Sequence, residues 1–182
     1  RSYTVPSSVT SIADFAFYGC DAMKSITLPE GLETIGEWAF ANCGIMGSFT
    51  LPTSVKHIGA NAFFGMKSCK SFYCGTIEPL PLREVTTPFG MFTDLSARIL
   101  YVPNAEAVKR YKVAPVWREF GKIVAYLGDV NGDGEVNVGD VTALINAILG
   151  DTTYEQKVCD INCDGEVNVT DVTTLINTIL ES

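Results

Sequence analysis

Two short stretches near the end of the chain place acid and amide side chains at alternate positions around a glycine. The first, GDVNGDGEVNVGD, spans 128–140, and the second, CDINCDGEVNVTD, spans 159–171. Strand interiors disfavour Asp, Asn and Gly, and helices tolerate this mixture poorly, so both stretches are expected to be loops. In such a loop, alternate oxygens point inward around an ion, and Ca²⁺ takes several hard oxygen ligands. We therefore expect two bound Ca²⁺ ions, one in each loop.

The spacing within each loop is that of an EF-hand calcium loop. When Asp129 and Asp160 are numbered position one, oxygen-bearing side chains fall at positions three, five, nine and twelve, and glycine falls at six. Position seven contributes only its backbone carbonyl, and position twelve is Asp where EF-hands usually carry Glu. One such loop can be a chance Asx-rich turn, whereas two in matching register favour calcium. The predicted ligands are Asp129, Asn131, Asp133, Glu135, Asn137, Asp140, Asp160, Asn162, Asp164, Glu166, Asn168 and Asp171.

An amphipathic helix is expected after each loop but not before it. VTALINAILG begins at Val141 and VTTLINTILES begins at Val172, both with apolar residues at helical spacing. Val136 and Val167 are expected to pair as a miniature strand between the loops. A core this small needs the metals as staples. The predicted core residues are Val141, Leu144, Ile148, Leu149, Val172, Leu175, Ile179 and Leu180.

Duplicated loop-then-helix segments with Asp at position twelve resemble the type I dockerin domain. The resemblance covers nearly all of 128–182, with segments at 129–150 and 160–181 that start 31 residues apart. It implies a secreted bacterial protein whose tail binds a cohesin module. Through that contact the protein would be attached to an extracellular scaffold such as a cellulosome.

The same resemblance places partner recognition at loop positions ten and eleven and helix positions seventeen and eighteen. Clostridial dockerins often carry Ser-Thr and basic residues there, and this chain carries neither pattern. We therefore expect an apolar contact, centred on Ile145 and Ile176, with a divergent cohesin or with the chain's own solenoid. The alternative is that these isoleucines fill the core of the tail. The predicted partner-binding residues are Val138, Gly139, Ile145, Asn146, Val169, Thr170, Ile176 and Asn177.

The cysteines fall into two groups. Cys159 and Cys163 together replace Gly128 and Gly132 of the first loop, and this paired change predicts a disulfide that tightens the second loop. Zinc is disfavoured there because only two thiols lie among calcium-type carboxylates. Four other cysteines stand where sister repeats carry Met, Cys or Leu, which favours buried thiols over bridges. These are Cys20, Cys43, Cys69 and Cys74.

The larger part of the chain is a repeat with a period of 23 residues, marked by Pro6, Pro29 and Pro52. Such a period is typical of leucine-rich solenoids, because one unit cannot bury its apolar face alone. Short strands are expected at SITL, SFTL and SFYC, with the chain turning back through Gly19, Asn42 and Gly65. The predicted core ladders are Val9, Leu32 and Val55; Ile12, Ile35 and Ile58; Ala16, Ala39 and Ala62; Phe17, Phe40 and Phe63; and Ile26, Phe49 and Phe72.

These units resemble the BspA-type leucine-rich repeat family, clearly so over 2–72. From about residue 73 the register decays, and a last strand at RILYVP with a short helix over 105–111 is expected to cap the solenoid. Tyr111, Trp117 and Phe120 are interpreted as packing in this cap, and a ligand-binding aromatic cluster is the alternative. The predicted fold is an α/β leucine-rich repeat solenoid, a right-handed coil with short strands, followed by a small all-α calcium-binding domain.

Charge divides the chain near 126–128. The segment 127–182 carries eleven acids against the single base Lys157, whereas 1–126 carries ten acids and twelve bases. We therefore predict a solenoid domain over 1–126 and a dockerin-like domain over 127–182. The acidic tail argues against nucleic acid as a partner. No apolar run is long enough to span a bilayer, and Arg1 opens within a repeat, so a targeting signal is expected upstream of this fragment.

Catalysis is not expected. His57 is the only histidine and is interpreted as a solvated residue of a repeat turn, and Glu30, Glu33 and Glu37 occupy variable polar positions. Two non-catalytic functions remain, both secreted or on the bacterial surface. One is an assembly protein whose tail docks a recognition solenoid onto a cohesin-like partner, in a context of polysaccharide degradation. The other is an adhesin whose solenoid binds host protein or glycan. The exposed repeat positions show no concentrated aromatic or basic stripe, so the ligand is not predicted.

Overall fold

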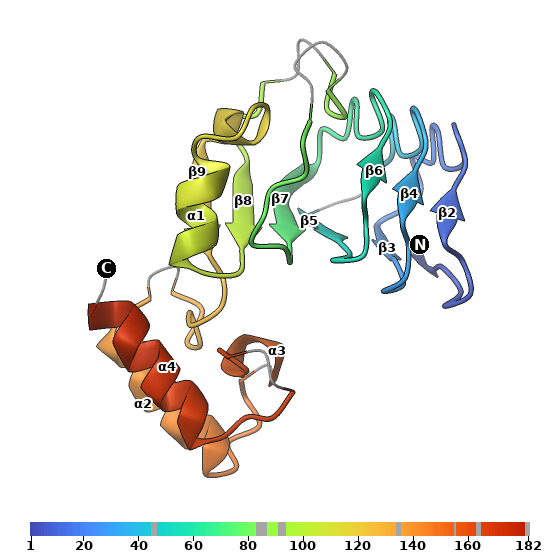
Figure 1. Ribbon diagram of the computed structural model, residues 1–182. Coiled ribbons are helices and arrows are strands. Elements are labelled where there is room, and N and C mark those ends of the chain that lie inside the picture. The colour runs from blue at the N-terminus through green and yellow to red at the C-terminus, as the bar shows by residue number, and fades with distance from the viewer. Residues whose placement is uncertain are drawn as a thin grey trace.

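The chain folds into a parallel β-solenoid of about five turns followed by a small helical region (Figure 1). This computed structural model describes residues 1–44, 47–82, 87–90, 94–133, 136–154, 156–162 and 165–180. The strands pair in three parallel sheets, β1-β3, β2-β4-β6 and β5-β7-β8-β9. Their bounds are β1 Ser2–Thr4, β2 Ser11–Ile12, β3 Ser25–Thr27, β4 Thr34–Ile35, β5 Gly47–Leu51, β6 His57–Ile58, β7 Cys69–Cys74, β8 Ile99–Val102 and β9 Lys122–Ala125.

The sequence period fixes the register of the turns of the solenoid. Ile12, Ile35 and Ile58 stand side by side on β2, β4 and β6, each 23 residues after the last. The segments after these strands continue the same ladder, since the Phe17 amide donates to the Ala39 carbonyl at 2.8 Å and the Phe40 amide to the Ala62 carbonyl at 2.8 Å. Backbone pairing between rungs therefore satisfies turns as well as strands.

The three predicted corner residues do turn the chain. Gly19, Asn42 and Gly65 have φ of 68°, 57° and 69°, the left-handed region that Gly and Asn tolerate best. Close approach of rungs explains Gly59, because a Cβ there would lie 2.4 Å from the backbone nitrogen of Glu37.

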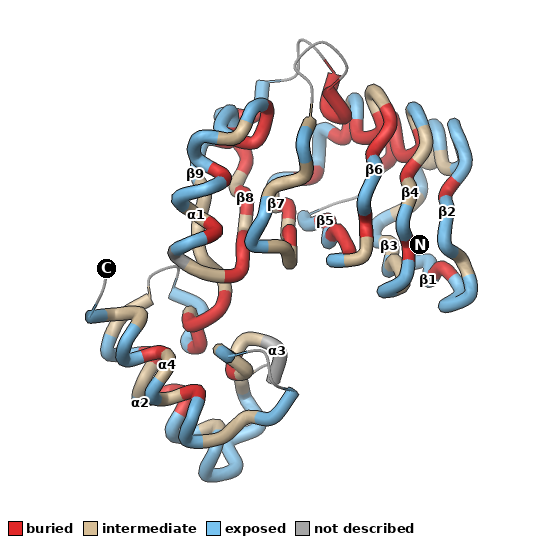
Figure 2. Tube along the Cα trace, in the orientation of Figure 1, coloured by how far each residue is buried: buried red, intermediate tan, exposed pale blue. Residues whose placement is uncertain are grey.

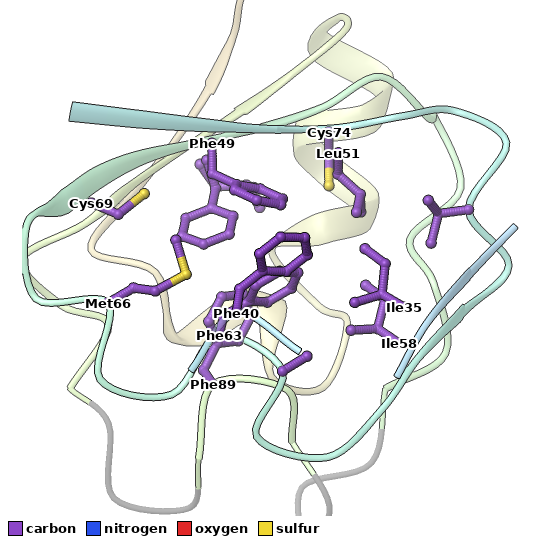
Figure 3. Close-up of a cluster of buried hydrophobic side chains, with 14 of the residues drawn as sticks. Ile35, Phe40, Phe49, Leu51, Ile58, Phe63, Met66, Cys69, Cys74 and Phe89 are labelled. Atoms are coloured by element: carbon purple, nitrogen blue, oxygen red, sulfur yellow. The ribbon is translucent and has the colours of Figure 1, made fainter. Parts of the chain in front are cut away.

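The interior is built from stacked phenylalanines, as the predicted ladders require. Phe40 lies parallel to Phe63, with ring centroids 6.1 Å apart, and Phe63 also meets Phe49, Phe72 and Phe89 (Figure 3). The second and third members of all five ladders are buried. In the first rung Ile12 is buried, Val9, Phe17 and Ile26 are half-buried, and Ala16 is exposed, because no described rung covers their outer side (Figure 2).

Two bulky side chains adopt a backbone conformation that only small residues usually take. Phe15 and Trp38 have φ of 58° and 57°, and Asn61, at the equivalent position of the third rung, has φ of 56°. For a residue with a Cβ this conformation costs roughly 1–2 kcal/mol, and Asn tolerates it better than an aromatic residue does. Phe15 and Trp38 are therefore strained positions of the fold.

The cap forms as predicted. Helix α1 spans Ala105–Tyr111, with Asn104 as its N-cap accepting from the Ala107 amide at 2.9 Å. A 3₁₀ turn, η2 (Trp117–Glu119), and β9 complete it. The Trp117 indole donates to the Leu80 carbonyl at 2.9 Å, and the Tyr111 hydroxyl pairs with that of Thr76. Tyr111, Trp117 and Phe120 are all buried, so their interpretation as cap packing is confirmed.

The tail contains two paired helices and a short third one. Helices α2 (Val138–Ile148) and α4 (Val169–Leu180) pack side by side, and α3 (Gln156–Cys159) precedes the second loop (Figure 1). No amphipathic helix was expected before either loop, and α3 is a single turn of four residues, which is too short to form an amphipathic helix. Both long helices begin three residues earlier than expected, at Val138 and Val169.

The predicted core of the tail is only partly correct. Leu144 and Leu175 are fully buried at its centre, and Val141, Val172 and Ile179 pack against them. Ile148, Leu149 and Leu180 are exposed, because α2 ends at Ile148 and Leu180 is the last residue of α4. Val136 and Val167 pack against this cluster, but no strand is assigned at either residue.

The solenoid ladder continues into the tail without a spacer. The Tyr126 amide donates to the Val102 carbonyl at 2.8 Å, and the Leu127 amide to the Pro103 carbonyl at 2.9 Å. Leu127 and Val130 are buried. The first predicted calcium ligand, Asp129, thus follows two residues after the last ladder bond. Among the described residues, no helix is long and apolar enough to cross a bilayer.

Replacing Phe63 by Ala tests the stacked core. Because Phe63 is 1% exposed and meets rings on several sides, we expect the free energy of unfolding to fall by about 3–5 kcal/mol, measured by chemical denaturation. The equivalent replacement of half-buried Phe17 is the matched control and should cost clearly less. Equal losses at the two positions would contradict a core centred on the inner rungs.

The buried thiols predict a loss of stability at alkaline pH. Desolvation raises the pKa of Cys43 and Cys69 to about 11 and that of Cys74 to about 12, from an ordinary value of 9.0. Thiols in the unfolded chain ionise at lower pH than these buried thiols. The contribution of the buried neutral thiols to the free energy of unfolding is therefore intact below about pH 9 and is lost as pH rises through about 11 to 12. Denaturation midpoints measured from about pH 8 to pH 11 should fall less steeply for Cys74→Ala than for the parent chain.

Candidate metal centre and partner surface

The two aspartates at loop position twelve are the only fully buried carboxylates among the described residues. The two carboxylate oxygens of Asp140 accept from the Asn131 amide at 3.0 Å and the Asn137 amide at 2.8 Å. Asp171 repeats this arrangement, accepting from the Ile161, Asn162 and Asn168 amides at 2.8, 3.2 and 2.9 Å. Each aspartate therefore ties the start of its loop to its end.

The asparagines at position nine join each loop to the helix that follows. Asn137 is the N-cap of α2: its side chain accepts from the Gly139 amide at 2.7 Å, and Asp140 completes a capping box. Asn168 likewise accepts from the Thr170 amide at 2.9 Å. This capping role was not anticipated, although Asn three residues before Asp is a recognisable capping signal. It explains why both helices begin within the loops.

The remaining predicted ligands are described in part. In the first loop the Asp133 amide donates to Asn131 Oδ1 at 2.9 Å, and Asn131 Nδ2 donates to Asp133 Oδ2 at 2.9 Å. In the second loop the Gly165 amide donates to Asp160 Oδ2 at 3.0 Å. Glu135 and Asp164 lie outside the described residues. Within the described part of the chain, no three His, Cys, Asp or Glu side chains gather as a metal cluster.

The donor chemistry of the loops fits Ca²⁺. Each loop brings carboxylates and asparagine amide oxygens together with backbone carbonyls, without a histidine, and hard oxygen donors of this kind suit calcium rather than zinc. The loops are closed by hydrogen bonds to Asp140 and Asp171, which sets the backbone framework from which the other oxygens project. The ligand set itself stays a prediction.

The predicted partner residues lie on the exposed surface of the two helices. Ile145 and Ile176 are 42% and 40% exposed, so they lie outside the buried cluster, and the alternative that they fill the core is not supported. Val138 and Val169 are each 70% exposed at the helix starts. Gly139, Asn146, Thr170 and Asn177 are exposed as well. Their contact with a partner stays a prediction.

Cysteine positions agree in part with expectation. Cys43, Cys69 and Cys74 are buried thiols and Cys20 is half-buried, as their places in the repeats indicate. Cys159 is buried, and both desolvation and the Asp171 carboxylate raise its pKa. Cys159 is a free thiol in this structure, and Cys163 lies outside the described residues, so the Cys159–Cys163 disulfide stays a prediction. Gly128 has φ of 98°, whereas Cys159 ends helix α3, so the entries to the two loops differ.

The candidate catalytic residues lie on the solvated surface. His57 is exposed. Glu33 forms an ion pair with Lys56 of the next rung at 2.6 Å, and Glu30 Oε2 accepts from the Thr53 hydroxyl at 3.0 Å. These carboxylates therefore link neighbouring rungs.

The solenoid does carry an exposed aromatic cluster, which corrects the expectation that it has none. Phe15, Tyr18 and Phe64 are 56%, 49% and 37% exposed, and Trp38 lies among them. The rings come from two different positions of the repeat, so no single column of the sequence shows them. The recurrent signal is an aromatic residue immediately before or after each AF pair, as in DFAFY and EWAFA.

Comparison with known families matches both parts of the chain. The family described as BspA type leucine rich repeat region matches residues 1–80 in six copies, and the dockerin type I domain matches residues 127–180. A type I dockerin implies a cohesin partner and typically binds calcium. Both modules are typically non-catalytic and typical of extracellular or surface proteins. No curated protein matches the chain.

Two solved structures are similar to the chain. A leucine-rich repeat protein from Bacteroides ovatus is 23% identical with a TM-score of 0.43, and the pneumococcal vaccine antigen PcpA is 19% identical with a TM-score of 0.41. Each match covers 68% of this chain, but only 30% and 41% of those chains. The chain therefore contains a BspA-type leucine-rich repeat region over residues 1–80 and a type I dockerin domain over residues 127–180.

Proposed function

We propose that this chain is a non-catalytic extracellular assembly protein. Its dockerin, folded around two Ca²⁺ ions, attaches the leucine-rich repeat solenoid to a cohesin-like partner, in a setting of polysaccharide degradation. The observation that carries the proposal is the pair of matching loops, each closed on a buried aspartate at position twelve. We assign the solenoid to 1–126 and the dockerin to 127–182.

The loops need a cation because of their charge. Asp129, Asp133 and Asp140 lie in one compact loop and Asp160, Asp164 and Asp171 in the other, so like charges repel in both. When bound, Ca²⁺ neutralises these carboxylates, and because the unfolded chain holds no such site, the binding energy is folding energy. We expect dissociation constants of about 10⁻⁷ to 10⁻⁴ M.

The partner surface is set by near-symmetry within the dockerin. Ile145 on α2 and Ile176 on α4 occupy equivalent positions and are almost equally exposed. Either segment can therefore present an exposed valine and isoleucine to one partner. An apolar contact of this kind selects a cohesin whose face lacks the acidic groups that basic dockerins meet.

A second function is favoured by the exposed rings around Trp38. In it the chain is a cell-surface adhesion protein whose solenoid binds host protein or glycan, and the dockerin serves as a calcium-stabilised module. The two functions differ in whether a cohesin binds the tail.

Removal of calcium should unfold the dockerin and spare the solenoid. Scanning calorimetry of the full chain should show a dockerin transition that excess EGTA abolishes and a solenoid transition that persists. Free Ca²⁺ at one hundred times its dissociation constant should add about 2.7 kcal/mol per site. Superimposable traces with and without chelator would refute the calcium role.

The matched variants for this experiment lie within the second loop. Asp160→Asn removes a predicted ligand charge while keeping the loop-closing Asp171, and it should raise the calcium dissociation constant at least roughly tenfold, a loss of about 1.4 kcal/mol. Glu166→Gln also removes one charge, but position seven contributes only its backbone carbonyl. The calcium affinity of this variant should therefore stay close to that of the parent chain. Equal losses would indicate a general charge effect rather than coordination.

Binding to cohesins should depend on the exposed isoleucines. In calcium, the full chain is to be tested by pull-down against a panel of cohesin modules. The double variant Ile145→Lys with Ile176→Lys should lose the partner while keeping its calcium-dependent transition, because neither side chain is in the core.

The control for this surface is Leu149→Lys with Leu180→Lys, at leucines that are each 79% exposed and lie at the helix ends. This variant should bind like the parent. Loss of binding in both double variants would show that added charge, rather than the predicted face, is responsible. Absence of binding to every cohesin would leave adhesion as the function.

A further inference from the structure

The exposed aromatic cluster joins three successive rungs of the solenoid. Trp38 stands at its centre, with ring centroids 6.4 Å from Phe15, 6.4 Å from Tyr18 and 5.4 Å from Phe64. The Phe15 and Trp38 rings are parallel to within 2°. The turns that carry these rings follow β2, β4 and β6 and lie side by side along the upper edge of the view in Figure 1. We call these four residues the aromatic edge.

Backbone strain indicates that the aromatic edge is not there for stability. Phe15 and Trp38 sit in the left-handed region, and Asn61 adopts the same φ at the equivalent place one rung later. Asn is the less strained choice at this position, as the third rung demonstrates. Phe15 is exposed and Trp38 is half-buried. Bulky residues held in such a conformation at a solvent-accessible surface are typical of ligand-binding sites.

The charged groups on these turns define the kind of partner. Over 14–19, 37–42 and 60–65 the charged residues are Asp14 and Glu37, and none is basic. Aromatic rings attract cations over their faces, and Trp does so best. Asp14 and Glu37 directly precede Phe15 and Trp38 in the chain. Carboxylates on the same turns as the rings therefore complement a guanidinium or ammonium group and repel anions.

Several polar groups of the aromatic turns are already engaged within the solenoid. Asp14 Oδ1 accepts from the Glu37 amide at 2.7 Å, and Asn42 Nδ2 lies 3.5 Å from the Tyr18 hydroxyl. A glycan needs directed hydrogen bonds to its hydroxyls, and these groups leave few for that purpose. An apolar and cationic surface needs only the rings and the negative charge.

We propose that the aromatic edge docks a protein segment that presents Arg or Lys among apolar side chains. The rings form the anchor of the contact and Glu37 supplies its charge selectivity, in keeping with the aromatic and arginine content of interface hot spots. The inference rests on the proposed role of the solenoid as a recognition module, and it is independent of calcium and of the cohesin.

A random-peptide display library, panned on the calcium-loaded full chain, tests the proposal. Counter-selection uses the double variant Phe15→Asn with Trp38→Asn, which should fold because Asn61 already adopts the same backbone conformation. We expect enriched peptides to carry Arg or Lys beside apolar residues and to bind the double variant at least roughly tenfold more weakly. Enrichment without a basic bias, or equal binding to the variant, would overturn the proposal.

Two further variants separate anchor, charge and fold. Glu37→Lys keeps the rings and should weaken the basic peptides, while Tyr3→Asn, which removes an exposed ring outside the aromatic edge, should leave them bound. The cohesin pull-down should be unchanged in all these variants, so failure here is distinct from failure of the dockerin role. In affinity electrophoresis, retardation by neutral xylan or β-glucan that Trp38→Asn abolishes would identify a glycan surface instead.

Discussion

The fold depends on one constraint. A single 23-residue rung can neither pair its own backbone hydrogen-bonding groups nor bury its own apolar side chains. Each strand pairs in parallel with a strand of a neighbouring rung, and the turns do the same through bonds such as that from the Phe40 amide to the Ala62 carbonyl. Identical spacing then places like residues above one another, so phenylalanines stack into a continuous core. The same stacking sets the outer surface, because Phe15 and Trp38 are brought together by the register that aligns Phe17 with Phe40.

The tail is held together differently from the solenoid. It is too small for a large core, and its buried cluster centres on Leu144, Leu175 and a few neighbours. Asp140 and Asp171 are buried within it and are satisfied by backbone amides, so removing either leaves orphaned donors at both ends of a loop. These carboxylates are therefore structural before any ion binds. The twofold repetition also places Ile145 and Ile176 at equivalent exposed positions of the two helices, where the proposed partner surface lies.

Features that recur at fixed spacing were predictable from the sequence. The core ladders follow from the 23-residue period, and the loops follow from their oxygen pattern. The strand at 99–102 and the helix Ala105–Tyr111 were expected from the resemblance to the repeat family, because the period has decayed there. The ends of the helices were not predictable in this way. Leu149 and Leu180 keep the helical apolar spacing, although both lie at helix ends and are exposed. Helix α3 was missed because four residues carry no periodicity. The aromatic edge was missed because its rings come from two repeat positions and meet only across rungs.

The connection between the solenoid and the dockerin is short. Ladder bonds run to Leu127, and the chain enters the first loop at Asp129 with Leu127 and Val130 buried, so few residues lie between the last ladder bond and the first loop. A short connection leaves an attached module less orientational freedom than a long linker does. Under the proposed function, a cohesin bound at α2 or α4 would therefore restrict the orientation of the solenoid as well. Exchange of the two equivalent segments on that cohesin would present the aromatic edge in a second orientation.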